Sequence, residues 1–223
     1  MKPEYAVIVA AGRGTRMQSS VPKQFMLLQH QPVLLHTLQA FYQYRTGINI
    51  IVVLPSEEIA TWQALCRQYH CTIPHQTVAG GTTRARSVQH GLAVIQEKDS
   101  LVAVHDGARP LVSKQVIEVS FQAAARYGSG VASVPLKDSL RYVQGLESTA
   151  CDRQAYRLMQ TPQTFQTHLL QEAYQKVGGR GSDDATVAEA AGHSVHLTEG
   201  DYRNIKITTP EDLAVAEALL KIY

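Results

Sequence analysis

The chain has 223 residues, of which 44% are apolar, and a formal net charge of +2 at pH 7. This length suffices for one α/β domain with a substantial core, and so small a net charge gives no reason to expect a nucleic-acid or membrane partner. No apolar run approaches the roughly 20 residues that a membrane-spanning helix needs. Three cysteines without a C-x-x-C pair and the absence of a signal-peptide pattern favour a cytoplasmic protein without a disulfide framework.

The first apolar run, Tyr5–Val9, is typical of a buried parallel strand, and a glycine-rich loop follows it. Gly12 and Gly14 permit tight turns in which successive N–H groups can surround phosphate oxygens. Three cations accompany the loop: Arg13, Arg16 and Lys23. The third glycine of the dinucleotide fingerprint is missing, and no P-loop sequence occurs. The loop therefore indicates a polyanion site of another class, with a plain strand-to-helix turn as the alternative.

Strand-like and helix-like runs alternate along the rest of the chain, which is the pattern of βαβ units. Further strands are expected at 48–54, 72–78, 101–104, 130–135, 195–197 and 204–208. Helices are expected at 33–42, 55–69, 85–95, 113–127, 168–176, 185–191 and 210–222, with Ser56 and Ser113 as N-caps and a turn at 161–165. We predict an α/β, Rossmann-like fold in one domain over 1–223, with a mostly parallel sheet and helices on both faces.

Two further segments follow expected strands directly. Gly80-Gly81 opens a second glycine-rich loop, and Asp106 follows the strand 101–104. Because ligands bind outside the carboxyl ends of parallel strands, the two glycine-rich loops could share one crevice. Gly80-Gly81 alone could be only a turn, and Asp106 could cap the next helix. Ser113 is the better cap for that helix, which favours a functional Asp106 in contact with a metal or a sugar.

The regular alternation stops at Lys137–Gln160, which is too long for a simple connection between a strand and a helix. It contains two strand-like pieces, 139–143 and 156–159. We expect an extended β-arm at about 137–160, and an arm with so small a core of its own usually packs on a partner subunit.

Acidic and histidine pairs near the C-terminus could suggest metal ligands. Asp183 and Asp184 could hold Mg²⁺, but they also suit a helix N-terminus, and we favour capping. His193 and His196 are three positions apart in an expected strand, so their side chains would point to opposite faces. We therefore expect no metal site formed by the protein alone.

Eight motifs occur in order between about Ala6 and Leu213: A-A-G-x-G-x-R-M, P-K-Q, G-G-x-x-R, H-D-x-A-R-P, D-R, T-P-Q-x-F, D-D-A and N-I-K-I-T-x-P-E-D-L. Together they resemble the 2-C-methyl-D-erythritol 4-phosphate cytidylyltransferases of the non-mevalonate isoprenoid pathway. The resemblance implies that the methylerythritol phosphate group attacks the α-phosphorus of CTP. Pyrophosphate leaves, and 4-diphosphocytidyl-2-C-methyl-D-erythritol forms. It also implies Mg²⁺ bound mainly through the CTP phosphates, and a homodimer joined through the arm.

The resemblance assigns roles by position in this chain. Catalytic roles are expected for Arg16, Lys23, Arg153 and Lys206. Nucleotide contacts are expected from Ala10, Ala11, Gly12, Gly14, Gly80, Ser87, Asp106 and Gly107. The polyol phosphate is expected to meet Asp106, Arg109, Ser139 and Arg153, the last two reaching from the arm of the neighbouring subunit.

Three positions depart from the family's pattern. Thr15 replaces an Arg, Ser139 replaces a Thr but keeps the hydroxyl, and Thr82 replaces an Asp, so one base or ribose contact loses its charge.

Two alternative functions stay open. Ribitol 5-phosphate cytidylyltransferases share most motifs but usually begin Leu-Ala-Gly-Gly rather than Ala10-Ala11-Gly12. The alternative from another class is an oxidoreductase or a non-catalytic nucleotide-binding module. An NAD domain should carry an acidic residue about 20 positions after the loop, whereas Glu57 lies more than forty positions on.

Overall fold

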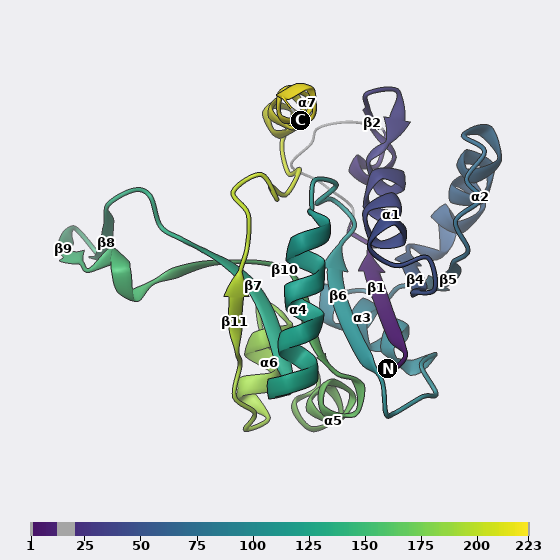
Figure 1. Ribbon diagram of the computed structural model, residues 1–223. Helices are drawn as coiled ribbons and strands as arrows, with labels where there is room; N and C mark the ends of the chain where they lie inside the picture. Colours follow the sequence, from purple (N-terminus) through teal and green to yellow (C-terminus); the bar gives the residue numbers. More distant parts are fainter. Residues whose placement is uncertain (1, 13–20, 223) are drawn as a thin grey trace.

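The computed structural model describes residues 2–12 and 21–222 and is built on a seven-stranded sheet of order β11-β7-β10-β6-β1-β4-β5 (Figure 1). The strands are β1 (Glu4–Val9), β4 (Asn49–Leu54), β5 (Gln76–Ala79), β6 (Leu101–Asp106), β7 (Ser129–Pro135), β10 (Arg157–Gln166) and β11 (Leu197–Glu199). β10 runs antiparallel to β6 and β7, and the other neighbouring pairs are parallel. The prediction of a mostly parallel sheet is confirmed.

Helices cover both faces of the sheet. The helices are α1 (Val33–Tyr44), α2 (Ile59–Gln68), α3 (Arg84–Ala93), α4 (Lys114–Tyr127), α5 (Thr167–Val177), α6 (Asp184–Ala190) and α7 (Pro210–Ile222). Alternate residues of β1 point to opposite faces, as the two-residue period of a strand requires. Ile8 packs in the core with Phe41 of α1 and Phe121 of α4, whereas Val7 packs with Leu92 of α3 and Leu170 of α5. The predicted double-sided arrangement is confirmed.

Smaller elements complete the fold. A two-stranded ribbon, β2 (Leu27–Leu28) with β3 (Gln31–Pro32), packs with α7 through a small cluster that includes Leu28 and Ala216. The described residues also include the short 3-10 helices η2 (Lys23–Phe25), η3 (Ser56–Glu58) and η4 (Arg153–Ala155). The ribbon and η2 follow the first glycine-rich loop, so they place Lys23 beside the sheet.

Two of three predicted caps are present. The Ser113 hydroxyl accepts from the Val116 N–H at 3.3 Å, and the Asp183 carboxylate accepts from the Thr186 N–H at 2.9 Å. The prediction for Ser56 is wrong, because its hydroxyl donates to the neighbouring Glu57 carboxylate inside η3 and α2 has no side-chain cap. The extra 3-10 turn moves the start of α2 past the serine.

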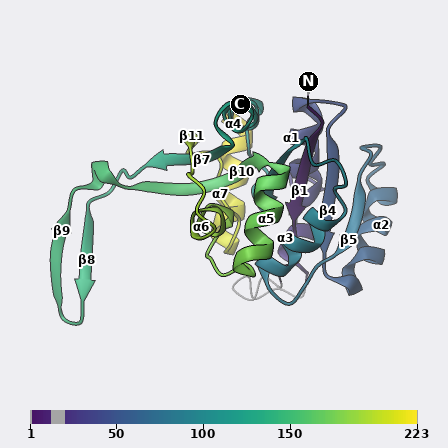
Figure 2. The ribbon, with the colours of Figure 1, turned by 90° about the horizontal axis from the view of Figure 1, so that it is seen from below.

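The expected arm is a hairpin of β8 (Leu140–Gln144) and β9 (Glu147–Cys151). Figures 1 and 2 show it projecting away from the rest of the chain. The side chains of Tyr142 and Val143 are 62% and 65% exposed, and Leu146 at the tip is fully exposed. The arm's apolar residues therefore find little cover in their own subunit. Of the two strand-like pieces, 139–143 corresponds to β8, while 156–159 belongs to β10.

Two local predictions are wrong. Residues 161–165 form part of β10 rather than a turn, because the proline sits where the register with β7 shifts, between Met159 and Gln163. Residues 204–208 form no strand, because both edges of β6 are already paired with β1 and β10. The segment instead crosses the strand ends, where the Ile207 N–H donates to the Ala108 carbonyl at 2.8 Å.

Candidate active site

The parallel strands β1, β4, β5 and β6 end side by side, and a cleft of about 810 Å³ opens at their carboxyl ends. Backbone hydrogen bonds hold the start of each loop against the neighbouring strand: the Ala10 N–H donates to the Val53 carbonyl at 2.8 Å, and the Gly80 N–H donates to the Leu54 carbonyl at 2.7 Å. Ala10, Ala11, Gly12, Gly80 and Gly81 all line this cleft. The structure thus brings the two glycine-rich loops to one crevice, at the place where ligands bind in open α/β sheets.

Gly80 lies so close to the first loop that a side chain cannot fit. A Cβ there would lie 2.6 Å from the Ala11 Cβ and 2.9 Å from the Ser87 hydroxyl. That hydroxyl donates to the Thr83 carbonyl at 3.0 Å and accepts from the Gly81 N–H at 3.1 Å. Ser87 therefore fixes the shape of the second loop as well as lining the cleft.

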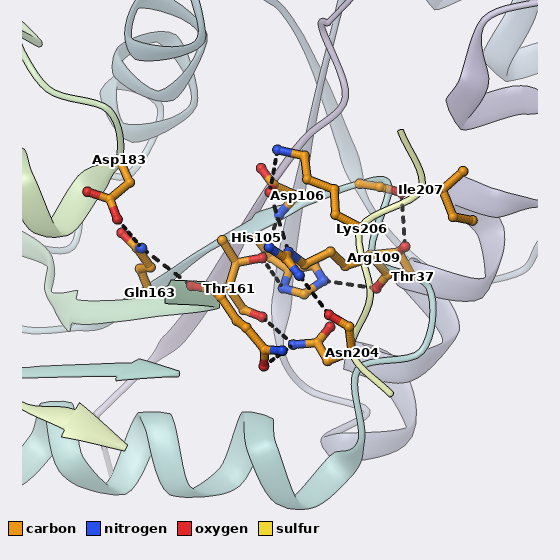
Figure 3. Close-up of polar contacts among 12 residues, drawn as sticks. Thr37, His105, Asp106, Arg109, Thr161, Gln163, Asp183, Asn204, Lys206 and Ile207 are labelled. Atoms are coloured by element: carbon orange, nitrogen blue, oxygen red, sulfur yellow. Dashed lines mark hydrogen bonds and ion pairs between the residues drawn. The ribbon is translucent and has the colours of Figure 1, made fainter. Parts of the chain in front are cut away.

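Asp106 gathers three cations at the end of β6. Its carboxylate lies 2.8 Å from Lys206 Nζ, 3.5 Å from Arg109 Nε and 3.6 Å from Arg84 Nε. Figure 3 shows Lys206 and Asp106 pointing toward one another. Burial alone would raise the pKa of Asp106, but the positive charges of Lys206, Arg84 and Arg109 outweigh it and lower the pKa below its usual value. The carboxylate is therefore ionised, and it fixes the cations in place.

Arg84 joins this centre to a second buried carboxylate. Its Nη2 donates to Asp184 at 2.7 Å, and the Asp184 side chain is completely buried. The Tyr174 hydroxyl donates to the same carboxylate at 2.6 Å. Burial would lower the pKa of Arg84, but Asp184 and Asp106 together raise it. Arg84 is thus a fixed cation on the wall of the cleft.

Lys23 and Lys206 approach the cleft from different parts of the chain. Lys23 Nζ donates at 3.3 Å to the carbonyl of Ile207, the residue that follows Lys206. Phe25 anchors η2 by stacking on Trp62 of α2, with ring centroids 6.1 Å apart. Both lysines line the cleft. Their ammonium groups suit a ligand that carries several negative charges.

Most of the predicted site residues within the described part of the chain come together. Those lining the cleft are Ala10, Ala11, Gly12, Lys23, Gly80, Ser87, Asp106 and Lys206. Gly107 packs against Ala10, and Arg109 pairs with Asp106 without lining the cleft. Ser139 and Arg153 do not line it, because both lie on the arm, where Arg153 donates to the Lys137 carbonyl. Gly14 and Arg16 lie outside the described residues.

Several residues of this centre were not predicted from the sequence. Arg84 belongs to the G-G-x-x-R motif, so the motif could have pointed to it. Its partner Asp184 lies 100 positions away, so the ion pair could not be predicted from spacing. Thr161 and Asn204 contact the centre from β10 and from the segment before Lys206. Thr82, the position expected to be Asp, lines the cleft with an uncharged side chain.

Over residues 2–12 and 21–222, no group of three or more His, Cys, Asp or Glu side chains is arranged to hold a metal ion. Asp183 and Asp184 are committed to the α6 N-terminus and to Arg84. In the same part of the chain, none of the helices has the length and apolar character to cross a bilayer.

Comparisons with known proteins point to one family. A family model described as 2-C-methyl-D-erythritol 4-phosphate cytidylyltransferase matches residues 5–222. A relative of that name from Porphyromonas gingivalis is 46% identical over 218 residues, which are 97% of each chain. A crystal structure of the enzyme of that name from Thermus thermophilus has a TM-score of 0.81 at 34% identity, covering 99% of this chain and all of the other. The 4-diphosphocytidyl-2C-methyl-D-erythritol synthase of Anaerococcus prevotii has a TM-score of 0.86 at 27% identity, covering 99% and 96%. The chain belongs to the 2-C-methyl-D-erythritol 4-phosphate cytidylyltransferase family.

Proposed function

We propose that this chain transfers a cytidylyl group from CTP to 2-C-methyl-D-erythritol 4-phosphate, the activity named for its family. The observation that carries the proposal is the single cleft in which two glycine-rich loops face Lys23, Arg84 and Lys206. Backbone N–H groups and fixed cations on one wall suit a nucleoside triphosphate. The comparisons favour neither the ribitol 5-phosphate reaction nor a non-catalytic binding module, because the matching family model and relatives are named as methylerythritol phosphate cytidylyltransferases.

The reaction exchanges one phosphoanhydride bond for another. An oxygen of the acceptor phosphate attacks the α-phosphorus of CTP, and the bond from that phosphorus to the bridging oxygen breaks to release pyrophosphate. Both reactants are anions, so holding them in line and neutralising the moving charge is most of the catalysis. Lys23 and Lys206 are positioned to do this, because they are linked through the Ile207 carbonyl and both line the cleft.

Magnesium fits this site only as an ion that the nucleotide carries. Asp106 offers a carboxylate, but it is already paired with Lys206 at 2.8 Å, and the described residues hold no acidic cluster. Triphosphate oxygens would supply most ligands, in keeping with the preference of Mg²⁺ for phosphate and water. When bound, the ion would neutralise charge on the leaving pyrophosphate.

The base specificity is expected to come from backbone groups near Ala10 and Gly80, and Gly80 lies too close to the neighbouring Ala11 to admit a larger residue. A site built to pair with the cytosine amino group leaves buried partners unsatisfied when a carbonyl takes its place.

The test is pyrophosphate release with each of the four nucleoside triphosphates and with either methylerythritol phosphate or ribitol 5-phosphate as acceptor. CTP with methylerythritol phosphate should give the highest kcat/KM. Equal rates with CTP and UTP would contradict the base assignment and implicate Thr82. Faster reaction with ribitol 5-phosphate would contradict the acceptor, and no release from any nucleotide would contradict the enzyme assignment.

A homodimer joined through the arm is also proposed. Support comes from the exposed apolar residues of the hairpin and from the position of Arg153, which lies on the arm and does not line its own cleft. Ser139 and Arg153 would then meet the acceptor phosphate in the neighbouring subunit. The cytoplasmic location stays a prediction from cysteine content.

Complementation tests the shared site directly. Lys23→Ala and Arg153→Ala should each give an inactive homodimer. In a mixed dimer, one site carries both defects and the other carries neither, so with random pairing about a quarter of all sites should be intact. Mixed dimers identified by mass spectrometry but lacking activity would show that Arg153 serves its own subunit.

A further inference from the structure

Two cysteines lie at the C-terminal end of α2, beside the β5 edge of the sheet (Figure 1). The Cys71 N–H donates to the Cys66 carbonyl at 2.8 Å, and the His70 N–H donates to the Arg67 carbonyl at 3.3 Å. His70 has a φ of 51°, in the left-handed region. These two bonds around a left-handed residue form a Schellman motif, in which the side chains at its two ends commonly touch. In this chain both ends are cysteines.

The two thiols meet and are half-buried. Both side chains pack at the margin of the core cluster that also includes Ile73. The Cys66 thiol donates a hydrogen bond to the Cys71 sulfur, and this bond, with burial, raises the pKa of Cys66. The same bond and a second one from the Ile73 N–H lower the pKa of Cys71, although burial opposes them. Cys71 is therefore the better nucleophile of the pair.

The motif also holds the two residues at a spacing that a covalent bond needs. A disulfide requires Cα atoms about 4.4–6.8 Å apart and Cβ atoms that face each other. A direct backbone hydrogen bond between Cys66 and Cys71 keeps their Cα atoms close, and the contact between the thiols shows that the side chains face each other. Closing the bond therefore requires no unwinding of α2.

We propose that Cys66 and Cys71 form a thiol–disulfide exchange site, which closes to a reversible disulfide when the protein meets a small-molecule disulfide. Neither cysteine lines the cleft. The site is thus separate from the proposed transfer reaction and does not depend on it.

The exchange takes two displacements. Cys71 gives up its proton, and its sulfur attacks one sulfur of the small disulfide, whose S–S bond breaks to release one thiol and leave a mixed disulfide on Cys71. Cys66 then loses its proton and attacks the Cys71 sulfur, and the second small thiol leaves with that proton. The two protein thiols are oxidised by two electrons, and one small disulfide is reduced to two thiols.

Oxidised glutathione is the probe. The folded chain is incubated with an excess of it, the remaining thiols are blocked with N-ethylmaleimide, and the peptides are identified by mass spectrometry. We expect the bond between Cys66 and Cys71 to exceed the glutathione adducts of these two residues by at least about tenfold, because the second displacement is intramolecular. Dithiothreitol should restore both thiols. A wild-type chain that carries glutathione on either residue without the bond, or that does not react there, would overturn the proposal.

Single variants separate the two roles. Cys66→Ser should trap the glutathione adduct on Cys71, whereas Cys71→Ser should leave Cys66 at least about tenfold less reactive. The control within the same chain is Cys151 on the arm, whose thiol donates to the Thr149 carbonyl at 3.9 Å. In Cys151→Ser the bond between Cys66 and Cys71 should form as in wild type. Loss of that bond in Cys151→Ser, or equal reactivity of the two single variants, would contradict the assigned pair.

Discussion

The cleft and the arm differ in how far their side chains are buried and paired within one subunit. Around Asp106, polar groups from distant segments are buried, paired and held by several bonds each. Along the hairpin, Tyr142, Val143 and Leu146 are exposed, and its side-chain hydrogen bonds are local, such as Arg141 to Ser148. Among the described residues, the cleft is lined by Lys23, Arg84 and Lys206 but not by Ser139 or Arg153. The arm carries both residues but lacks a surface to pack on. In the proposed dimer, one subunit would therefore contribute to two sites, with its cleft to one and its arm to the other.

The largest expected effect is loss of charge from the cleft. Lys23→Ala should lower kcat by about 10²–10³-fold with little change in KM for CTP, because its ammonium faces charge that moves in the transition state. Lys176→Ala is the matched control, since Lys176 also donates to a carbonyl, at 2.8 Å, but lies outside the cleft. Steady-state pyrophosphate release measures both. A Lys23→Ala enzyme within about tenfold of wild type would remove Lys23 from the mechanism. Arg16→Ala should behave in the same way.

Breaking the arm should act on assembly rather than on the cleft. Val143→Asp places a charge where an apolar contact is proposed and should weaken dimerisation by about 10²-fold or more. Val215→Asp, on the exposed side of α7, is the control, because the Val215 side chain is also exposed, at 49%. Sedimentation equilibrium measures the dissociation constant of the dimer for each variant. An unchanged constant for Val143→Asp would argue against arm-mediated dimerisation.

The buried histidine makes the cleft region sensitive to pH. Burial lowers the pKa of His105 from 6.5 to about 4. Between these values the unfolded chain binds a proton that the folded chain excludes, so stability falls as pH falls through this window. At pH 5.0 this costs about 2 kcal/mol relative to pH 7.5.

His105→Gln removes that titration. In urea unfolding, the stability advantage of the wild type over this variant should shrink by about 2 kcal/mol between pH 7.5 and 5.0. A constant difference for His105→Gln would mean that His105 does not titrate in this window.

The smallest expected effect concerns loop spacing. Gly80→Ala should raise KM for CTP by about fivefold, because the added Cβ would lie 2.6 Å from the Ala11 Cβ and push the two loops apart. Gly47→Ala is the control, since a Cβ at that position would have nothing within 4 Å. Initial rates over a range of CTP concentrations measure the change. Equal KM values for both variants would show that the loops tolerate separation.

Local sequence patterns predicted most of the helices and strands. The predictions that failed concern segments whose structure depends on how strands pair in the folded protein. Apolar runs and caps such as Ser113 predicted the alternating strands and helices, since these signals lie within a few residues. A turn was predicted at 161–165, but the segment is part of β10, because a proline is tolerated where a strand leaves its ladder. The β-branched residues of 204–208 suggested a strand, but β6 had no free edge to offer.

The same distinction between local signals and distant contacts applies to the residues of the site. Motif positions such as Lys23 and Asp106 could be read from the chain, because each lies next to an expected strand or loop. Arg84 and Asp184 could not be paired from spacing, since 100 residues separate them. The contact between Thr161 and the Asp106 N–H depends on a register shift in β10, and no periodicity in the sequence encodes that shift.

The ion pair between Lys206 and Asp106 has a consequence for the ionic strength dependence of nucleotide binding. A lysine at 2.8 Å from a buried carboxylate already has a counter-ion before any ligand arrives. A triphosphate that recruits Lys206 therefore exchanges one anionic partner for another, and few dissolved ions are displaced from this ammonium group. The apparent Kd for CTP should rise less steeply with added salt than the number of cations in the cleft would suggest.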